Sequence, residues 1–348
     1  MTQTAIPFLF MRGGTSRGPY FNRADLPVDR ETLANVLIAA VGSGHPLNID
    51  GVGGGAAVTT KVAMLSKAEG DWADVDYFFA QVSVEDRKVD FKPTCGNILC
   101  GVASAAIEMG LVPAQNGATE IKINAVNTGA RVISTVRTEG GAVLYDGDTA
   151  IDGVPGTSSP VGVSFMEVSG SMTGKILPTG KVRNTFEGVD VTCMDVAMPV
   201  VIAHADAFGK TGYESVAELN EDSAFIHRML AVRLAAGDAM GMGDVTESVT
   251  PKFAILSEPR ADGAISARYF MPWKCHPAMA VTGAQCIASC ALMRGTVAEE
   301  LTRKPNDNPA RVVIEHPSGS IEVLVDYLSL IHISEPTRQA ESRMPSSA

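Results

Sequence analysis

Apolar and polar residues alternate along many short stretches of this chain and follow a helical period in only a few places. Alternation with a period of two is typical of strands with one buried face, and it is found at 80–91, 131–148, 265–271 and 311–328. Apolar residues at helical spacing predict helices near 30–41, 97–109, 215–236 and 277–293. Turn residues at 140–141 and 317–319 predict two β-hairpins. Many strands with few helices favour an α+β fold over regular βαβ repeats.

Two of the predicted helices carry no charged residue, since none occurs in 93–107 or in 277–293. Each has apolar residues at helical spacing, and most of its remaining positions are Gly, Ala, Ser, Thr or Cys. A helix without a polar face is expected to be buried on all sides. Small residues also allow neighbouring strands to approach closely. We therefore expect two central helices, each wrapped by strands.

The two halves of the chain resemble each other. The sequence KVAML at 61–65 is similar to KFAIL at 252–256, and each follows a glycine-containing loop. Each is followed by predicted strands and then by one of the uncharged helices, which end at Gly110 and Gly295. A repeat on this scale indicates a duplicated structural unit.

The duplication predicts two pseudo-symmetric β-roll domains, at 1–155 and 160–326, each built around one central helix. The segment 152–162 is rich in Gly, Pro and Ser, which is typical of a linker. The first domain would then contain Lys61 and Cys95.

Composition narrows the classes of partner. The chain has 28 Lys and Arg against 39 Asp and Glu, so its net charge is −11, which disfavours nucleic acids and anionic membranes. Aromatic residues are only 6%, which argues against base-stacking surfaces. The short apolar run near the N-terminus has no basic segment before it, and no 18-residue apolar stretch occurs. We expect a cytoplasmic protein, and a homodimer is compatible with the sequence.

The six cysteines form no C-x-x-C pair, and with no export signal they are expected to be reduced thiols. Their spacing does not match a zinc site, and we expect no metal. Most of them lie in apolar or strand-like segments and are predicted to be core residues, namely Cys100, Cys193, Cys286 and Cys290; Cys275 is ambiguous.

Candidate chemistry lies where the uncharged helices begin. Helix N-termini present free N–H groups and a partial positive charge, and they bind anions. The first of these helices opens around Cys95-Gly96-Asn97, and the second around His276-Pro277, where proline suits the first helical position. If the halves are related by pseudo-twofold symmetry, both N-termini face one cleft. Such a cleft suits a small molecule with two carboxylates.

The loop RGGTSRG at 12–18 would add the hydroxyl groups of Thr15 and Ser16 and the cation of Arg17 to that cleft. Its structural alternative is an ordinary turn. We take these three residues, together with Gly96, Asn97 and His276, as candidate substrate-binding residues.

Cys95 and Lys61 are the candidate reactive groups. A thiol at a helix start is placed where its thiolate is stabilised, although most free cysteines are small buried hydrophobic residues. Lys61 opens an apolar run, and a buried amine favours the neutral form that a base needs. Its alternative is a surface lysine that keeps its charge in water. Lys252 occupies the matching place in the second half, so spacing alone does not choose between the two.

The chain resembles the PrpF family, which has the diaminopimelate-epimerase-like fold. The resembling segments are spread from about residue 6 to about 326, and they are MRGGTSRGPYF (11–21), IDGVGGG (49–55), TTKVAML (59–65), DYFFAQVSVEDRKVDF (76–91), CGNILCGV (95–102), YDGDTAIDGVPGTSSPV (145–161), LPTGKVRNTFEGVDVT (177–192), MPVV (198–201), GYES (212–215) and CHPAMAVTGA (275–284).

The resemblance implies two β-rolls, a cofactor-free site between them, and Lys61 and Cys95 as the catalytic pair. Epimerases of this fold use two cysteines, one at each helix start. Counted back from Gly110 and Gly295, Cys95 corresponds to Ala280, which disfavours a two-cysteine racemase. One thiol and one amine suit instead an isomerase that moves a proton between two carbons of its substrate.

Within the family the pattern is most similar to members that tautomerise 4-oxalomesaconate in gallate and protocatechuate degradation. Isomerisation of 2-methylaconitate or aconitate is the alternative within this class. A non-catalytic carboxylate-binding protein, with Lys61 and Cys95 as core residues, is the alternative from another class. A hydratase would need a water-activating cluster that the sequence does not display. After Asp326 the sequence no longer resembles the family, and 327–348 is expected to be an artefactual tail.

Overall fold

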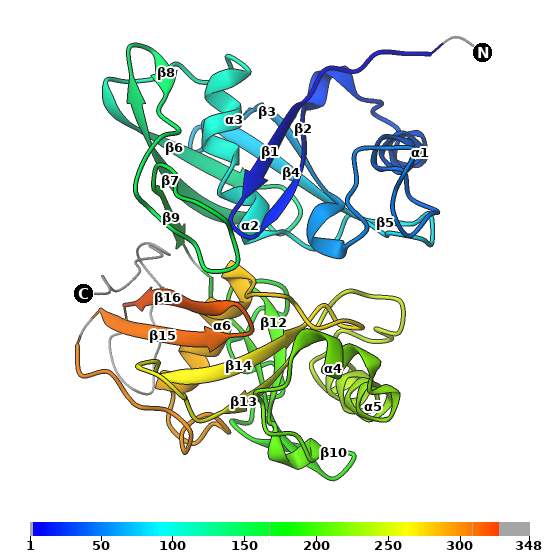
Figure 1. Cartoon of the computed structure of the whole chain (residues 1–348), viewed down its shortest axis with the longest axis vertical. Helices are drawn as coiled ribbons and strands as arrows, with labels where there is room; N and C mark the ends of the chain where they lie inside the picture. The colour runs from blue at the N-terminus through cyan, green and yellow to red at the C-terminus, as the bar shows by residue number, and fades with distance from the viewer. Residues whose placement is uncertain (1–2, 167, 308, 327–348) are drawn as a thin grey trace. The chain divides into compact units, whose positions relative to one another are not determined.

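The structure is a computed structural model that describes residues 3–166, 168–307 and 309–326 and divides the chain into two compact units (Figure 1). Unit 1 comprises Met1–Asp148 and Thr157–Val163, and unit 2 comprises Thr149–Gly156 and Ser164–Ala348. The segment expected to be a linker is therefore shared between the two units. The predicted tail at 327–348 lies outside the described residues.

Within the described residues, the sheet of unit 1 is mixed and nine-stranded, in the order β1-β2-β3-β4-β6-β7-β8, with β5 paired to β4 and β9, whose residues from Ser164 on are counted with unit 2, paired to β7. Its strands are β1 (Leu9–Gly13), β2 (Ser16–Asn22), β3 (Lys61–Lys67), β4 (Val75–Val82), β5 (Val89–Asp90), β6 (Gly117–Ala125), β7 (Ala130–Glu139), β8 (Ala142–Val143) and β9 (Val161–Met166). Its helices are α1 (Arg30–Val41), α2 (Gly96–Leu99) and α3 (Val102–Glu108), with short 3-10 turns at Arg23–Asp25 and Ala57–Thr59.

The described part of unit 2 forms a seven-stranded sheet in the order β10-β11-β12-β13-β14-β15-β16. Its strands are β10 (Asn184–Phe186), β11 (Val189–Asp195), β12 (Pro199–His204), β13 (Lys252–Ser257), β14 (Ile265–Phe270), β15 (Ala310–His316) and β16 (Gly319–Val325). Its helices are α4 (Val216–Glu221), α5 (Ser223–Ala239) and α6 (Val281–Leu292), with a 3-10 turn at Asp206–Phe208.

The two sheets have the same topology, which confirms the predicted duplication. The series β1-β2-β3-β4-β6-β7 corresponds strand by strand to β11-β12-β13-β14-β15-β16. In both series the second and third strands are parallel, the fourth and fifth strands are parallel, and the other neighbours are antiparallel. Lys61 and Lys252 are the first residues of corresponding strands. Both predicted hairpins are also present, as β7–β8 and β15–β16.

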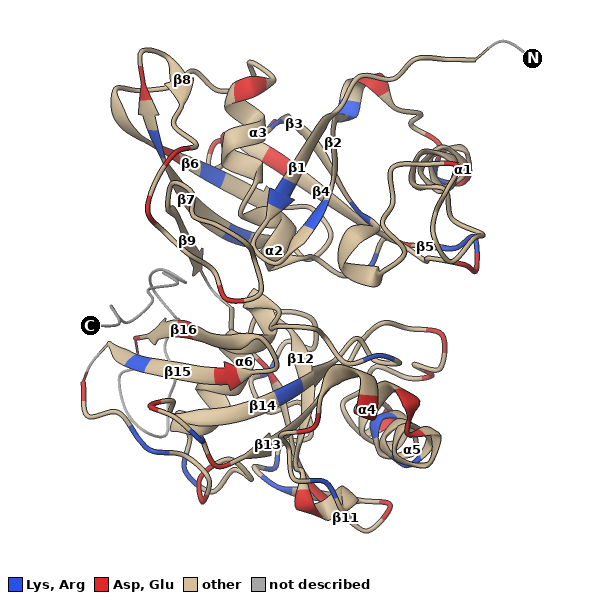
Figure 2. Ribbon diagram, viewed as in Figure 1, with Lys and Arg blue, Asp and Glu red and all other residues tan. Residues whose placement is uncertain are grey.

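The uncharged helices are buried within their units, as predicted. All twelve residues of α6 are buried, as are all four residues of α2 and the first six residues of α3. Figure 2 shows α2 and α6 without a charged residue. Helix α6 contacts strands at both ends of its sheet, β11 and β12 on one side and β15 and β16 on the other. In unit 1, α2 contacts β1, β2 and β3, while α3 contacts β3, β7 and β8.

Three helix boundaries differ from the prediction. The helix predicted at 97–109 is divided into α2 and α3 at Cys100–Gly101. There the Gly101 N–H donates to the carbonyl of Ile98 (3.0 Å), three residues earlier in the chain instead of the four of an α-helix. The helix predicted at 215–236 is divided by Asp222, whose backbone is not helical and whose carboxylate caps α5.

The third difference concerns the start of α6. Its first residue is Val281 and its N-cap is Ala280, not the residues around Pro277. The preceding segment forms a turn tied to β14, because the His276 N–H donates to the carbonyl of Tyr269. The His276 ring then accepts the Ala278 N–H (3.0 Å). Residues 277–280 therefore belong to this turn, and the helix begins only after it, at Val281.

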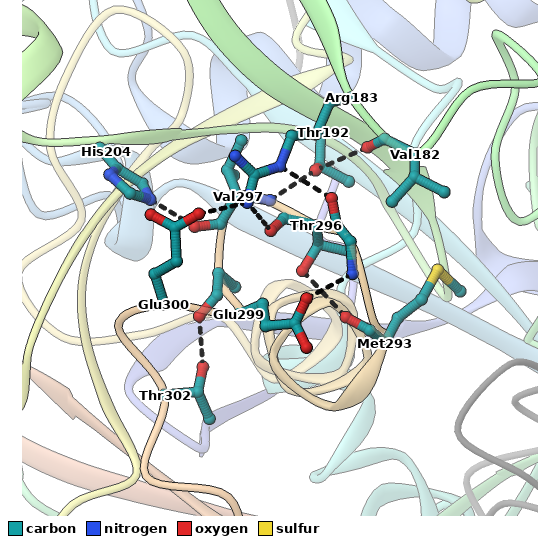
Figure 3. A network of polar contacts seen from close by, with 12 residues as sticks. Val182, Arg183, Thr192, His204, Met293, Thr296, Val297, Glu299, Glu300 and Thr302 are labelled. Carbon is teal, nitrogen blue, oxygen red and sulfur yellow. Dashed lines mark hydrogen bonds and ion pairs between the residues drawn. The ribbon is translucent and has the colours of Figure 1, made fainter.

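At the far end of α6, Thr296 from the following loop and Arg183 from the segment before β10 donate hydrogen bonds (Figure 3). The hydroxyl of Thr296 donates to the carbonyls of Cys290 (2.8 Å) and Met293 (3.1 Å). The guanidinium of Arg183 donates to the carbonyls of Gly295 (2.8 Å) and Thr296 (2.7 Å). These bonds satisfy the carbonyl of Cys290 within the last turn of α6 and three carbonyls of the segment that follows it. Among the described residues, no helix has the length and apolar character needed to cross a membrane.

Candidate active site

Lys61 and Cys95 meet in the interior of unit 1. Lys61 is the first residue of β3, and Cys95 is the N-cap residue of α2. Their side chains are in contact, with 3.3 Å between Nζ and Sγ, and each residue is only 8% exposed. The surface-lysine interpretation is therefore wrong for Lys61. An amine and a thiol in direct contact form a pair that can exchange a proton.

Strand β4 supports both members of this pair. The register pairs Lys61 with Gln81. Because every second residue of a strand points to the same face, Gln81, Phe79 and Tyr77 all lie on the face of the sheet that carries the Lys61 side chain. The amine lies 5.6 Å from the centre of the Phe79 ring. The phenol of Tyr77 donates to the carbonyl of Cys95 (3.2 Å). Sequence reasoning missed both aromatic residues, because aromatic residues in a strand are usually interpreted as core; the alternation in DYFFAQV was the available signal.

The loop between β1 and β2 packs against the first turn of α2. The amide of Asn97 donates to the hydroxyl of Thr15 (2.6 Å). Gly13 lies so close to α2 that a Cβ atom there would overlap with the carbonyl oxygen of Asn97. Thr15 is thus hydrogen-bonded to the helical turn that follows Cys95, which contains Gly96 and Asn97. Arg17 is exposed instead, and its guanidinium lies over the ring of Phe10, at 5.2 Å from the ring centre.

Two buried hydroxyl groups, one on β2 and one directly before Cys95, lack partners among the described residues. Ser16 begins β2, and Thr94 directly precedes Cys95. Both residues are buried, and neither hydroxyl has a hydrogen-bond partner within the described part of the chain. Burying a hydroxyl without a partner is costly, so these groups are suited to a bound polar molecule. Thr94 was not among the predicted site residues.

Unit 2 has no thiol at the corresponding position. The N-cap of α6 is Ala280, where α2 has Cys95, which agrees with the correspondence predicted from the sequence. Lys252 begins β13 as Lys61 begins β3. His276 belongs to unit 2, so it is not among the residues that unit 1 gathers around the pair. It is buried, and its Nδ1 atom is engaged by the Ala278 N–H.

Of the other thiols, Cys193, Cys275, Cys286 and Cys290 are buried, as expected of core residues, and Cys100 is half-buried. Burial raises the pKa of Cys100, Cys193, Cys275 and Cys290 to about 12. Burial also raises the pKa of Cys286 well above its ordinary value. These thiols stay protonated at neutral pH and are poor nucleophiles. The described residues contain no group of three His, Cys, Asp or Glu side chains arranged to hold a metal ion.

Gly18 is expected to be intolerant of alanine. It lies on β2 beside the backbone of Lys61, and an added Cβ would overlap with the Lys61 carbonyl oxygen. Strands β2 and β3 would have to separate at this point, which should cost about 3 kcal/mol, the upper end for overpacking. We expect Gly18→Ala to lower the melting temperature by about 6–12 °C. Gly70→Ala is the matched control, because nothing lies within 4 Å of its added Cβ. Equal melting temperatures for the two variants would contradict this account.

Comparison with known proteins places the chain in a family. A family model described as "PrpF protein" matches residues 3–333, and the match thus continues slightly beyond Asp326. The chain belongs to the PrpF family. It is 45% identical over 323 residues to the 4-oxalomesaconate tautomerase of Pseudomonas putida, with 93% of this chain and 90% of that protein covered. It is 33% identical over 345 residues to the 3-methylitaconate isomerase of Eubacterium barkeri, covering 92% and 90%.

Solved structures confirm the predicted fold class. The crystal structure of methylitaconate-delta-isomerase superposes with a TM-score of 0.77 at 32% identity, covering 96% of this chain and 92% of that one. A hydroxyproline epimerase from Agrobacterium vitis superposes with a TM-score of 0.54 at 14% identity, covering 92% and 83%. The second likeness concerns the fold alone, and it agrees with the expected epimerase-like α+β architecture.

Proposed function

We propose that this PrpF-family isomerase moves a proton, and with it a double bond, within an unsaturated tricarboxylate, and that 4-oxalomesaconate is its preferred substrate. The observation that carries the proposal is the buried contact between the Lys61 amine and the Cys95 thiol. The choice of substrate is supported by the higher identity to the 4-oxalomesaconate tautomerase (45%) than to the 3-methylitaconate isomerase (33%).

The substrate makes the first step chemically accessible. A CH₂ group flanked by a carbonyl and an unsaturated carboxylate is already acidic. In the proposed step the neutral amine of Lys61 removes one proton from this CH₂ group and becomes an ammonium. The electron pair of the broken C–H bond moves into the conjugated system as a dienolate. General-base catalysis of this kind requires an unprotonated base within hydrogen-bond reach of the proton that it removes.

The second step returns a proton to a different atom of the conjugated system. If Cys95 donates it, the pair ends as an ammonium and a thiolate, and the proton crosses the 3.3 Å contact to restore both groups. If Lys61 donates it, the pair is restored at once. Either route conserves protons and leaves only the position of the double bond changed. The negative charge that develops would be stabilised by preorganised donors, for which we propose the hydroxyls of Ser16 and Thr94.

The remaining predicted residues would hold the substrate carboxylates. We propose Thr15, Gly96 and Asn97 for this role, since Gly96 and Asn97 follow Cys95 in α2 and Asn97 is hydrogen-bonded to Thr15. Arg17 and His276 remain predicted substrate-binding residues. Side chains of this chain suffice for every step, so the proposal includes no cofactor.

Isomerisation should be visible directly with purified protein. We expect micromolar protein to change the ultraviolet absorbance of 4-oxalomesaconate, because the extent of conjugation changes. A panel with 2-methylaconitate, aconitate and 3-methylitaconate would rank the substrates. Absence of a spectral change with every acid in the panel, combined with measurable binding, would favour a carboxylate-binding protein instead.

Solvent deuterium separates proton transfer from hydration. When the reaction is run in D₂O, we expect deuterium in the product, because the proton carried by an amine or a thiol exchanges with solvent. Mass spectrometry of the product measures this gain. A product heavier by the mass of one water molecule would show hydration and contradict the proposal.

A further inference from the structure

We propose that Tyr77 is a positioning residue that holds Cys95 at its working distance from Lys61. The kinetic part of this inference rests on the proposed function. The structural part rests on a single strand, β4, which carries Tyr77 and also pairs directly with the strand that carries Lys61.

The backbone of Tyr77 is held by strand pairing on both sides of β4. Strand β4 lies inside the sheet, between β3 and β6. Tyr77 is paired with Leu65 on one side and with Ala125 on the other. Lys61 belongs to the same ladder, four residues along β3 from Leu65. The backbones of Lys61 and Tyr77 are therefore fixed relative to each other by strand hydrogen bonds.

The helix that carries Cys95 lacks comparable support of its own. Helix α2 has four residues, and its N-cap has no side-chain hydrogen bond. A single helical turn is unstable without contacts from outside. The carbonyl of Cys95 accepts two hydrogen bonds, from the Leu99 N–H (2.9 Å) and from the Tyr77 phenol (3.2 Å). Of these two bonds, only the one from Tyr77 links Cys95 to the sheet that holds Lys61.

The Tyr77 phenol is suited to donate a lasting hydrogen bond to the Cys95 carbonyl. Tyr77 is fully buried, and burial raises its pKa well above the ordinary value. It therefore remains a protonated donor throughout the neutral range. In Tyr77→Phe the ring would still fill its place, and only the hydrogen bond to Cys95 would be lost. A displacement of about 1 Å at a reacting group can cost up to 100-fold in rate.

Tyr20 supplies a matched control. It is also fully buried, and its phenol donates to a carbonyl of the same helix, that of Ile98 (2.6 Å). Ile98 lies three residues beyond Cys95. Tyr20→Phe thus removes one buried phenol bond to α2 without touching the carbonyl of Cys95.

Kinetics of the two variants test the inference with the intact protein. We expect Tyr77→Phe to lower kcat about tenfold and to leave KM within about twofold, because the substrate contacts remain in place. We expect Tyr20→Phe to lower the melting temperature to a similar extent and to keep kcat within about twofold. A kcat for Tyr77→Phe within twofold of the wild type would overturn the inference, as would equal losses of kcat in both variants.

Alkylation of Cys95 provides a measurement that needs no substrate. Iodoacetamide is added to each folded protein, and tandem mass spectrometry distinguishes Cys95 from the neighbouring Cys100. We expect the alkylation rate of Cys95 to change at least threefold in Tyr77→Phe and to stay unchanged in Tyr20→Phe. If the wild type isomerises none of the tested acids, the proposed function fails, and alkylation still decides the role of Tyr77. An unchanged rate in Tyr77→Phe would overturn that role.

Discussion

Replacement of Lys61 by alanine is expected to lower kcat about 10³-fold while unit 1 stays folded. The proposed base is removed, and general-base catalysis typically contributes a factor of about 10² to 10⁴. The Cys95 thiol would then have lost the amine with which it exchanges a proton. Lys61→Met, which fills the same space without an amine, should show the same loss. Steady-state kinetics with 4-oxalomesaconate and a thermal unfolding curve for each variant measure both parts of the prediction.

Lys252 provides the internal control for this experiment. It begins β13 as Lys61 begins β3, but the corresponding N-cap residue in its unit is Ala280 and not a cysteine. We expect Lys252→Ala to keep kcat within about threefold of the wild type. The opposite pattern, with activity lost in Lys252→Ala and kept in Lys61→Ala, would show that the catalytic lysine has been assigned to the wrong half.

The sequence predicted the fold well where one local signal decides the structure. Helix α1 has the predicted bounds, because Asp29 caps its first turn and Gly42 ends it in a left-handed conformation (φ 79°). The duplication could be recognised because corresponding strands begin with similar sequences. Breaks inside the predicted helices were missed. Gly101 was a weak signal for the break, because a single glycine is tolerated in a helix, and the Tyr20 phenol that packs against it is distant in sequence.

Pro277 illustrates a local signal that tertiary structure overrides. Proline is favoured at the first helical position, and this led to a start for the second helix that is four residues too early. The turn around His276 depends on a bond to Tyr269, whose pairing no local pattern shows. In the same way, the sequence indicated Lys61 and Cys95 as separate candidates. Their contact follows from strand register and helix placement, which a single sequence does not contain.

The loops that precede the two lysines show how duplicated units can differ in detail. Before β3, the buried Asn48 side chain donates to the carbonyls of Gly42 (3.0 Å) and Val84 (3.0 Å) and accepts the Gly55 N–H (2.9 Å). Before β13, the buried guanidinium of Arg233 has the corresponding role. The topology is shared, whereas the residue that holds the loop is specific to each unit. Sequence similarity between the halves is therefore weak in these loops.

Replacement of Arg233 by alanine is expected to destabilise unit 2 by about 4 kcal/mol. The guanidinium is fully buried and donates to the carbonyls of Pro251 (2.7 Å), Thr250 (3.0 Å), Val245 (3.2 Å) and Ser248. Burial lowers its pKa to about 10, so it remains charged at neutral pH and keeps all its donors. Its removal would take this donor from the carbonyls of Pro251, Thr250 and Ser248, at about 1–3 kcal/mol for each buried group that water does not reach, whereas the Val245 carbonyl keeps the Ser248 N–H. Chemical denaturation, followed by a probe in unit 2, measures the change.

Arg228→Ala is the control for Arg233→Ala, because both arginines lie on α5. Arg228 is exposed, and its guanidinium lies 5.3 Å from the centre of the Phe208 ring. Loss of such a contact should cost about 0.5–1 kcal/mol. If both variants unfold at the same denaturant concentration, the buried guanidinium does not hold the loop before β13. If only Arg233→Ala is destabilised, the loss is due to the unsatisfied carbonyls and the lost packing of that side chain, since both variants remove one positive charge from the same helix.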